Sequence, residues 1–271
     1  MTKIIITFAL LMGLLPIIGC NERLAITEEF KETYEVESGT KLNVSNSNGG
    51  ISISKWENSC VEVFAIKKTY LNEDELKKVE IIINRENDEF NIKTEYLTKN
   101  PKVSVSYEIK VPFGILVNDI LTSNGKISLQ GTTGNSILKT SNGKIFVRNV
   151  DGIINAKTSN GKISILETKG IIQALTSNGK IEVELPDIVD QDIDVSTSNG
   201  AIKIYLSPET NAELEMKTSN GKISLNDIKL VVSKISSTHV KGELGNGGNR
   251  INIRTSNGSI NLYSKNNPGA I

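Results

Sequence analysis

The chain has 271 residues, which is enough for one large β domain or two ordinary domains. Its 31 Lys and Arg balance its 31 Asp and Glu, so no overall positive charge attracts nucleic acid, and we expect no nucleic-acid partner. The single His, His239, argues against His-based acid–base chemistry and against a His-rich metal site. Aromatic residues make up only 5%, and the apolar residues are mainly Ile, Val and Leu, which suits narrow β cores.

The first twenty residues carry the features of an export signal. Lys3 precedes an apolar run from Ile4 to Leu15, which is too short for a stable membrane span. The run ends in PIIGC, and small or aliphatic residues before Cys20 resemble the lipobox of bacterial lipoprotein signals. This resemblance implies cleavage before Cys20 and a diacylglyceryl group on its thiol. The alternative is an ordinary secretory signal with a chance Cys at the boundary.

We therefore expect residues 1-19 to be a lipoprotein signal peptide and residues 20-27 to be a short tether. The mature protein would be exported and lipid-anchored to the cell membrane or outer membrane, on the extracytoplasmic side. Two or three acyl chains give stable anchoring, whereas one chain is marginal. The expected partner at this end of the chain is the membrane, through the lipid on Cys20.

The next part of the chain, residues 28-120, predicts strands in an irregular arrangement and one short helix. Alternating runs such as FKETYEV, TKLNVSNSNGGISISKW and CVEVFAIKKTY indicate strands. NEDELKKV indicates the helix, with Asn72 as its N-cap and acidic residues in its first turn. Two further strands, EIIINRE and EFNIKTEY, precede the run VSVSYEIKVPFGILVN, which leads into a regular repeat.

From residue 121 onward the chain repeats the motif Thr-Ser-Asn-Gly-Lys-Ile with small variations. The Asn residues of the motif are Asn124, Asn142, Asn160, Asn178, Asn199, Asn220 and Asn257. The steps between them are 18, 18, 18, 21, 21 and 37 residues, and a fixed period of this size indicates a repeat architecture. The last step is close to two repeats, so we expect one repeat there without the signature.

Apolar residues alternate on both sides of each Asn, as Ile163 and Ile165 do after Asn160, which is the period of a half-buried strand. Two architectures fit: an antiparallel meander with Asn-Gly hairpins, or a parallel β-solenoid with Asn-Gly at a corner. Only the solenoid gives a reason to repeat Thr, Ser and Lys as well. Its coils stack about 4.8 Å apart, so each residue lies on its own copy.

We therefore predict an all-β fold, a single-stranded parallel β-solenoid (a β-helix, expected to be right-handed) with about 18–21 residues per coil. Its N-terminal third would be irregular and contain the one short helix. Within the motif, Asn stacked on Asn can form a side-chain amide ladder, inward or at the corner. Thr would point inward and hydrogen-bond to Thr of the next coil, and Gly would supply a left-handed corner. The Thr residues expected in this structural ladder are Thr122, Thr140, Thr158 and Thr176.

The lysines of the motif predict an outward stripe, which is interrupted at Ala201 and Ser259. Its members are Lys126, Lys144, Lys162, Lys180 and Lys222. Two interpretations remain open. The stripe is either a basic rail that binds an anionic polymer, or a solvated corner whose charges block sideways pairing and whose stems cover apolar neighbours.

The chain resembles the bacterial "putative adhesin" family of β-repeat lipoproteins of unknown function. The resemblance rests on GGISISKWENSCVEVFAIKK, on YEIKVPFGILVNDILTSNGKISL and on the late GELGNGGNRINIRTSNGSINLY. It implies a β-solenoid domain over residues 28-264, divided into the irregular part 28-120 and the TSNG repeats 121-264, with a polar tail at 265-271. It also implies a secreted, lipidated or membrane-tethered protein without established catalytic residues, and related modules are linked to envelope-stress systems.

No group of side chains in the sequence predicts catalysis. One His leaves no Ser-His-Asp or Cys-His set, and no Gly-rich phosphate loop opens a helix, so we expect no cofactor, no metal site and no enzyme activity. The expected function is that of a lipid-anchored cell-envelope scaffold, adhesin-like or binding module, with an envelope protein or an anionic glycan as partner. The alternatives are a glycan-active β-helix enzyme and a purely structural envelope protein.

Overall fold

A computed structural model describes residues 24–185 and 190–265 and contains 21 strands and one short helix in these ranges. The strands are β1 Ile26–Glu35, β2 Lys41–Ser45, β3 Ile51–Lys55, β4 Cys60–Thr69, β5 Val79–Glu86, β6 Glu89–Tyr96, β7 Val103–Val111, β8 Leu116–Leu121, β9 Ile127–Gln130, β10 Ser136–Lys139, β11 Ile145–Lys157, β12 Ile163–Asn178, β13 Ile181–Glu184, β14 Ile193–Asn199, β15 Ile202–Leu206, β16 Ala212–Asn220, β17 Ile223–Asn226, β18 Val231–Ile235, β19 His239–Leu244, β20 Arg250–Asn257 and β21 Ile260–Ser264. The all-β fold class is confirmed.

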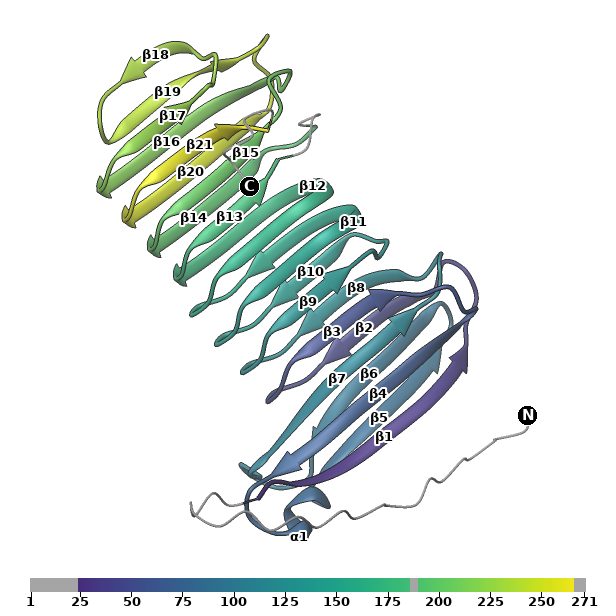
Figure 1. Ribbon diagram of the computed structural model, residues 1–271. Helices are drawn as coiled ribbons and strands as arrows, with labels where there is room; N and C mark the ends of the chain where they lie inside the picture. The colour runs from purple at the N-terminus through teal and green to yellow at the C-terminus, as the bar shows by residue number, and fades with distance from the viewer. Residues whose placement is uncertain (1–23, 186–189, 266–271) are drawn as a thin grey trace.

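The strands form one long stack with two faces, because each repeat contributes one strand before its Asn and one after it (Figure 1). Face A holds the strands that precede each Asn and, at its two ends, β5 with β6 and β19 with β18. Their order is β5, β6, β2, β8, β10, β11, β12, β14, β20, β16, β19 and β18. Face B holds the strands that follow each Asn and, at one end, β1, β4 and β7. Their order is β1, β4, β7, β3, β9, β11, β12, β13, β15, β21 and β17. The long strands β11 and β12 take part in both faces.

Neighbouring repeats pair in parallel and in the register that the motif predicts. Ile145 pairs with Ile127 on one side and with Ile163 on the other, so equivalent residues lie on one another. The inward-pointing residues of both faces, such as Ile163 and Ala174, are fully buried and belong to one hydrophobic cluster. The two alternating runs of each repeat therefore build a shared core, and the motif lies at the corner between them.

Antiparallel pairs close both ends of the stack, which differs from the parallel pairing predicted over residues 28-264. At one end β1 pairs with β4, β4 with β7, and β5 with β6. At the other end β16 pairs with β19, and β19 with β18. A hairpin returns the chain antiparallel to its last strand, so it can cover a stack end without starting another repeat. The sheet is therefore mixed.

The 37-residue step after Asn220 does not contain a repeat without its signature, and that prediction is wrong. The segment 227–249 instead carries β18 and β19, which pair antiparallel at the end of the stack. The chain then returns and inserts β20 between β14 and β16, and β21 between β15 and β17. At the other end β2 and β3 are inserted in the same manner, between β6 and β8 and between β7 and β9.

The one helix, α1, spans Glu73–Leu76, and the Asn72 side chain accepts a hydrogen bond from the backbone N–H of Glu75 at its start. It is the helix predicted from NEDELKKV, and in the described ranges no helix has the length and apolar character needed to cross a membrane. The predicted signal peptide 1-19, Cys20, and residues 266–271 of the predicted tail lie outside the described residues.

Candidate functional site

A continuous ladder of Asn side chains runs along the motif corner. The amide of Asn160 donates to the Oδ1 of Asn142 at 2.9 Å, and the amide of Asn178 donates in turn to Asn160 at 2.9 Å. All the ladder bonds are 2.8–2.9 Å long, and in spatial order they join Asn48, Asn124, Asn142, Asn160, Asn178, Asn199, Asn257 and Asn220. All of these residues except the half-buried Asn48 are exposed, so the ladder lies on the surface of the corner.

The Thr residues of the motif are buried, but they do not bond to one another as predicted. Thr158 is 3% exposed, and its hydroxyl donates to the carbonyl oxygen of Gly143 in the adjacent repeat at 3.0 Å. The corresponding bonds of the other motif Thr residues are 2.9–3.2 Å long. Each hydroxyl therefore gives a hydrogen-bond partner to the Gly carbonyl at the corner of the adjacent repeat, which lies next to the core.

The Gly of the motif serves for close packing between repeats, and the predicted left-handed corner is absent. None of the seven motif glycines is among the residues with positive φ. A Cβ built on them would lie 1.8–2.0 Å from the carbonyl oxygen of the glycine in the adjacent repeat. A real Cβ cannot approach a backbone atom so closely, so only Gly allows the corners to stack at strand spacing.

All five lysines of the predicted stripe are exposed beside this corner. Lys162 pairs with Glu182 at 2.5 Å, and this hydrogen bond holds the pKa of the Glu182 carboxyl below its ordinary value although burial opposes the shift. The Nζ of Lys126 lies 5.7 Å from the ring centroid of Phe146, within cation–π range. Lys144 and Lys180 form no ion pair with any residue in the described part of the chain.

A second column of basic residues flanks the Asn ladder on face A, and sequence reasoning missed it. Its exposed members are Lys139, Lys157, Arg254 and Lys217. The signal was the residue before the Thr in four of the seven motifs, as in LKTSNG and IRTSNG, which alternation turns outward. Leu121, Leu175 and Ser196 hold this position in the other three and interrupt the column. We call the two columns together the basic corner. It consists of Lys126, Lys144, Lys162, Lys180, Lys222, Lys139, Lys157, Lys217 and Arg254.

The opposite corner of the stack is hollowed into an open groove of about 990 Å³. Several repeats line it, with Gly134, Gly152 and Gly170 among the lining residues. Its charged side chains are largely neutralised: Lys169 pairs with Asp151 at 2.6 Å, and Lys41 pairs with Asp88 at 3.1 Å. The groove therefore offers amide, hydroxyl and aliphatic contacts more than net charge.

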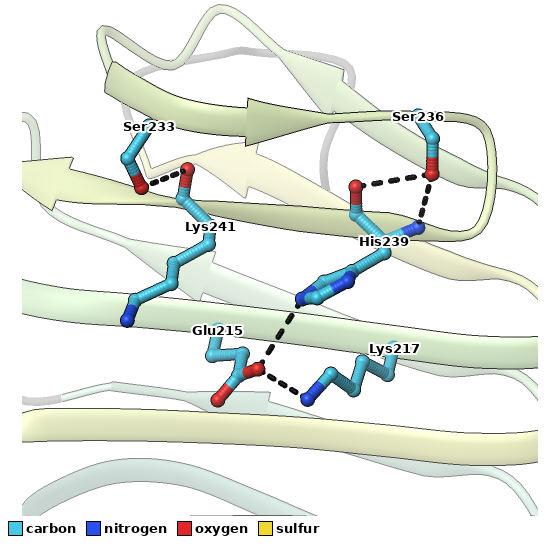
Figure 2. Close-up of polar contacts among 6 residues, drawn as sticks. All are labelled: Glu215, Lys217, Ser233, Ser236, His239 and Lys241. Atoms are coloured by element: carbon cyan, nitrogen blue, oxygen red, sulfur yellow. Dashed lines mark hydrogen bonds and ion pairs between the residues drawn. The ribbon is translucent and has the colours of Figure 1, made fainter.

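The single His takes part in a polar cluster at the β18–β19 end of the stack (Figure 2). The Glu215 carboxylate contacts Nε2 of His239 at 3.2 Å and also pairs with Lys217, which holds the pKa of Glu215 below its ordinary value. The Ser236 hydroxyl accepts from the backbone N–H of His239 at 2.9 Å, so it caps the turn. These contacts fix the hairpin against β16.

Groups of three or more His, Cys, Asp or Glu side chains that could hold a metal ion are absent from the described ranges. Acidic side chains of the repeats instead form ion pairs with basic side chains of neighbouring repeats, as Glu167 does with Arg148 at 2.8 Å. The geometry that the repeat does provide is linear: columns of amides, hydroxyls and cations along the motif corner. Such columns suit an extended ligand that runs along the stack.

No protein-family model matches the chain, and no curated protein matches it. Among solved structures, a putative cell adhesion protein from Clostridium sporogenes is 17% identical over 88% of this chain and 100% of its own, with a TM-score of 0.32. A putative adhesin from Bacteroides fragilis is 13% identical over 88% and 97%, with a TM-score of 0.47. A third, from Parabacteroides distasonis, is 10% identical over 87% and 97%, with a TM-score of 0.42. Two of these structures are described as putative adhesins and one as a putative cell adhesion protein, which matches the "putative adhesin" family that the sequence resembles.

Proposed function

We propose that the protein is a lipid-anchored, non-enzymatic β-solenoid of the cell envelope, whose basic corner binds an anionic polymer, most simply an anionic glycan. The observation that carries the proposal is the basic corner itself, nine cations on both sides of one exposed ladder of Asn side chains. A polymer with regularly spaced anionic groups can follow such a column from repeat to repeat. The envelope location rests on the export signal and on Cys20.

The solenoid interpretation is supported by the register of the parallel pairs. The step from Ile127 to Ile145 and from Ile145 to Ile163 is one sequence period, so the chain advances by one coil for each motif. A meander would instead pair each motif's two strands antiparallel to each other. Stacked coils form a stiff rod, which is the geometry that a surface scaffold or adhesin-like module needs.

The spacing of the cations supports an extended anionic ligand. Four successive lysines, Lys126 to Lys180, span about 14 Å at the strand spacing of about 4.8 Å. Like charges at this distance repel, which costs stability and makes the column a strong attractor for anions. Only Lys162 in this set pairs with a carboxylate of the described residues. Exposed charges of this kind are screened by salt, so binding is expected to weaken steeply as ionic strength rises.

Binding of the purified chain to polygalacturonate, followed by calorimetry at several salt concentrations, tests this function. A quadruple Lys→Gln variant at the corner should lose binding and keep its fold by circular dichroism. Its substitutions fall at Lys126, Lys144, Lys162 and Lys180. A matched control removes the same net charge from exposed lysines elsewhere and should bind normally. The control substitutions, also to Gln, fall at Lys55, Lys99, Lys102 and Lys229.

Equal binding by the corner variant and the control, or binding that is insensitive to salt, would contradict the role of the basic corner. Release of reducing ends from the polymer, abolished by one carboxylate substitution, would contradict the non-enzymatic assignment. The anchor has its own test: Cys20→Ser should release the protein from membranes and block signal processing. A membrane-bound Cys20→Ser protein with a processed N-terminus would show that Cys20 is not the anchor.

A further inference from the structure

The strand β18 ends face A at the opposite end of the stack from β1 (Figure 1). Its pairing partner among the described strands is β19 alone, so the backbone groups of its outer edge are free to pair. Its large apolar side chains are exposed: Val231 by 70%, Val232 by 42% and Ile235 by 69%. An apolar edge strand of this kind is a ready template for a strand from another chain.

The other end of the stack has two edge strands, β5 on face A and β1 on face B, and both carry more charged residues than β18. β5 has three charged residues in eight, and its exposed large apolar side chain, Ile82, is 38% exposed, less than those of β18. The edge strand β1 carries four Glu and one Lys in ten residues. Its apolar residues Ile26, Phe30 and Tyr34 are half-buried against the core. Charged edge strands discourage pairing with other chains. The edge strands at that end are therefore more charged than β18, which is the more apolar and more exposed edge.

The charge around β18 selects its partner. From Ile228 to Glu243 the chain has Lys229, Lys234 and Lys241 and one acid, Glu243, which lies opposite Val231, so the net charge is +2 with His239 neutral. Pairing of two β18 edges would bring +2 against +2, and like charges on adjacent strands are destabilising. A strand that carries carboxylates between its apolar residues would complement the same surface.

The local backbone limits how long the added strand can be. The register of β18 against β19 shifts between Val232 and Lys234, which leaves Ser233 as an extra residue, and its hydroxyl donates to the backbone carbonyl of Lys241 at 3.2 Å (Figure 2). Such a bulge interrupts the ladder and opposes open-ended sheet growth. The His239–Glu215 contact holds the hairpin in place, so the edge is ordered before a partner arrives.

We propose that β18 is a strand-addition site for a short extended segment of a partner protein in which apolar residues alternate with Asp or Glu. Backbone hydrogen bonds along the edge give affinity, and the apolar side chains of β18 with Lys234 give specificity. The site lies on the terminal strand of face A and shares no residue with the basic corner. It therefore stands or fails independently of polyanion binding.

The test uses the full chain and a fluorescent peptide, Thr-Val-Glu-Val-Glu-Val-Thr, followed by anisotropy, with a second peptide in which Lys replaces Glu. The acidic peptide should bind at least about tenfold more tightly than the basic one. The double variant Val231→Thr/Ile235→Thr, which keeps β-branched residues in the strand, should weaken acidic-peptide binding by about tenfold or more. Phe113→Thr, at a side chain that is 78% exposed elsewhere, is the matched control and should bind normally.

Equal affinity for the two peptides, or unchanged affinity in the double variant, overturns the proposal. Self-association of the full chain in analytical ultracentrifugation that disappears in the double variant also overturns it, because the occupant is then a second copy. Should the double variant misfold, Lys234→Glu provides the same test, since it lowers the local net charge from +2 to zero and should abolish the preference for the acidic peptide. The quadruple Lys→Gln corner variant should bind the acidic peptide as the unmodified chain does, so failure of the basic corner and failure of β18 are distinguishable.

Discussion

The stacked glycines make a quantitative prediction at Gly161, in the middle of the stack. In Gly161→Ala the new Cβ would lie 1.9 Å from the carbonyl oxygen of Gly143, and the adjacent repeats must move apart by about 1.1 Å to bring this contact to 3.0 Å. The clash is with backbone, so a side-chain rotation cannot relieve it. The whole corner therefore has to separate, together with the hydrogen bonds that cross it.

Four of the hydrogen bonds that cross this corner lie beside the clash and would stretch well beyond hydrogen-bond range. They are Gly143 N to Asn160 O at 3.1 Å, Asn160 N to Ser141 O at 2.8 Å, Asn160 Nδ2 to Asn142 Oδ1 at 2.9 Å and Thr158 Oγ1 to Gly143 O at 3.0 Å. At about 1 kcal/mol each, their loss lowers the free energy of unfolding by about 3–5 kcal/mol. That is a large effect for one methyl group.

The assay is urea unfolding followed by circular dichroism, with Gly50→Ala as the matched control. Gly50 occupies the Lys position of the looser first repeat and has no positive φ, and its Cβ would lie 3.3 Å from the nearest atom. Its replacement should cost less than about 1 kcal/mol. A Gly161→Ala midpoint no lower than that of Gly50→Ala would refute the close-packing explanation. Tolerance of Gly161→Asn would favour a left-handed corner instead, because Asn adopts that conformation readily.

Three further predictions concern the ladder, the pH response and the inserted strands. Asn160→Ala removes two exposed side-chain hydrogen bonds and should lower the free energy of unfolding by about 1 kcal/mol. Lys162→Ala should change it by less than about 0.5 kcal/mol, and equal melting temperatures of the two variants would count against the ladder. Burial raises the pKa of Tyr107 to about 12, although the hydrogen bond with Thr94 lowers it. The neutral hydroxyl therefore contributes its full stabilisation below pH 10, and this stabilisation is lost as the pH rises toward 12. This loss should amount to about 2–3 kcal/mol and be absent from Tyr107→Phe in alkaline unfolding curves. A chain that ends at Asn249 lacks β20 and β21, so limited proteolysis should cut β16 to β19 rapidly; protection equal to that of the full chain would contradict the insertion.

Alternation and period were sufficient to predict the strands and the stacking of equivalent residues, because both follow from local geometry. Ile127, Ile145 and Ile163 occupy the same place in each motif, and a fixed period leaves one register that aligns them all. The helix was predictable for a similar reason, since an Asn at the N-cap and acids in the first turn act within a few residues. The all-β class needed nothing more.

The roles of Thr and Gly were harder to predict, because identity alone does not specify which atom of the next repeat a side chain meets. Gly is compatible with positive φ and with close approach, and only the structure shows that the carbonyl of Gly143 fills the space beside Gly161. Thr158 bonds to the same carbonyl, so Thr and Gly of adjacent repeats act together. A coupled requirement of this kind explains why the motif recurs as a unit.

The order of the last strands could not be predicted for a physical reason. The strand that ends at Asn199 pairs with the one that ends at Asn257, and its motif would be equally complementary to Asn220, because all motifs present the same Thr, Asn and Gly. Local pairing energy therefore cannot decide which repeat comes next in space. What decides is the segment 227–249, which is long enough to form a hairpin on β16 and return the chain to the gap behind it. Insertion places the final motif between two complementary neighbours, whereas a final repeat in sequence order would have one neighbour and an open edge. Each inserted motif thus gains a second set of corner hydrogen bonds, from Asn257 to Asn199 and from Asn220 to Asn257, and the open edge passes to β18.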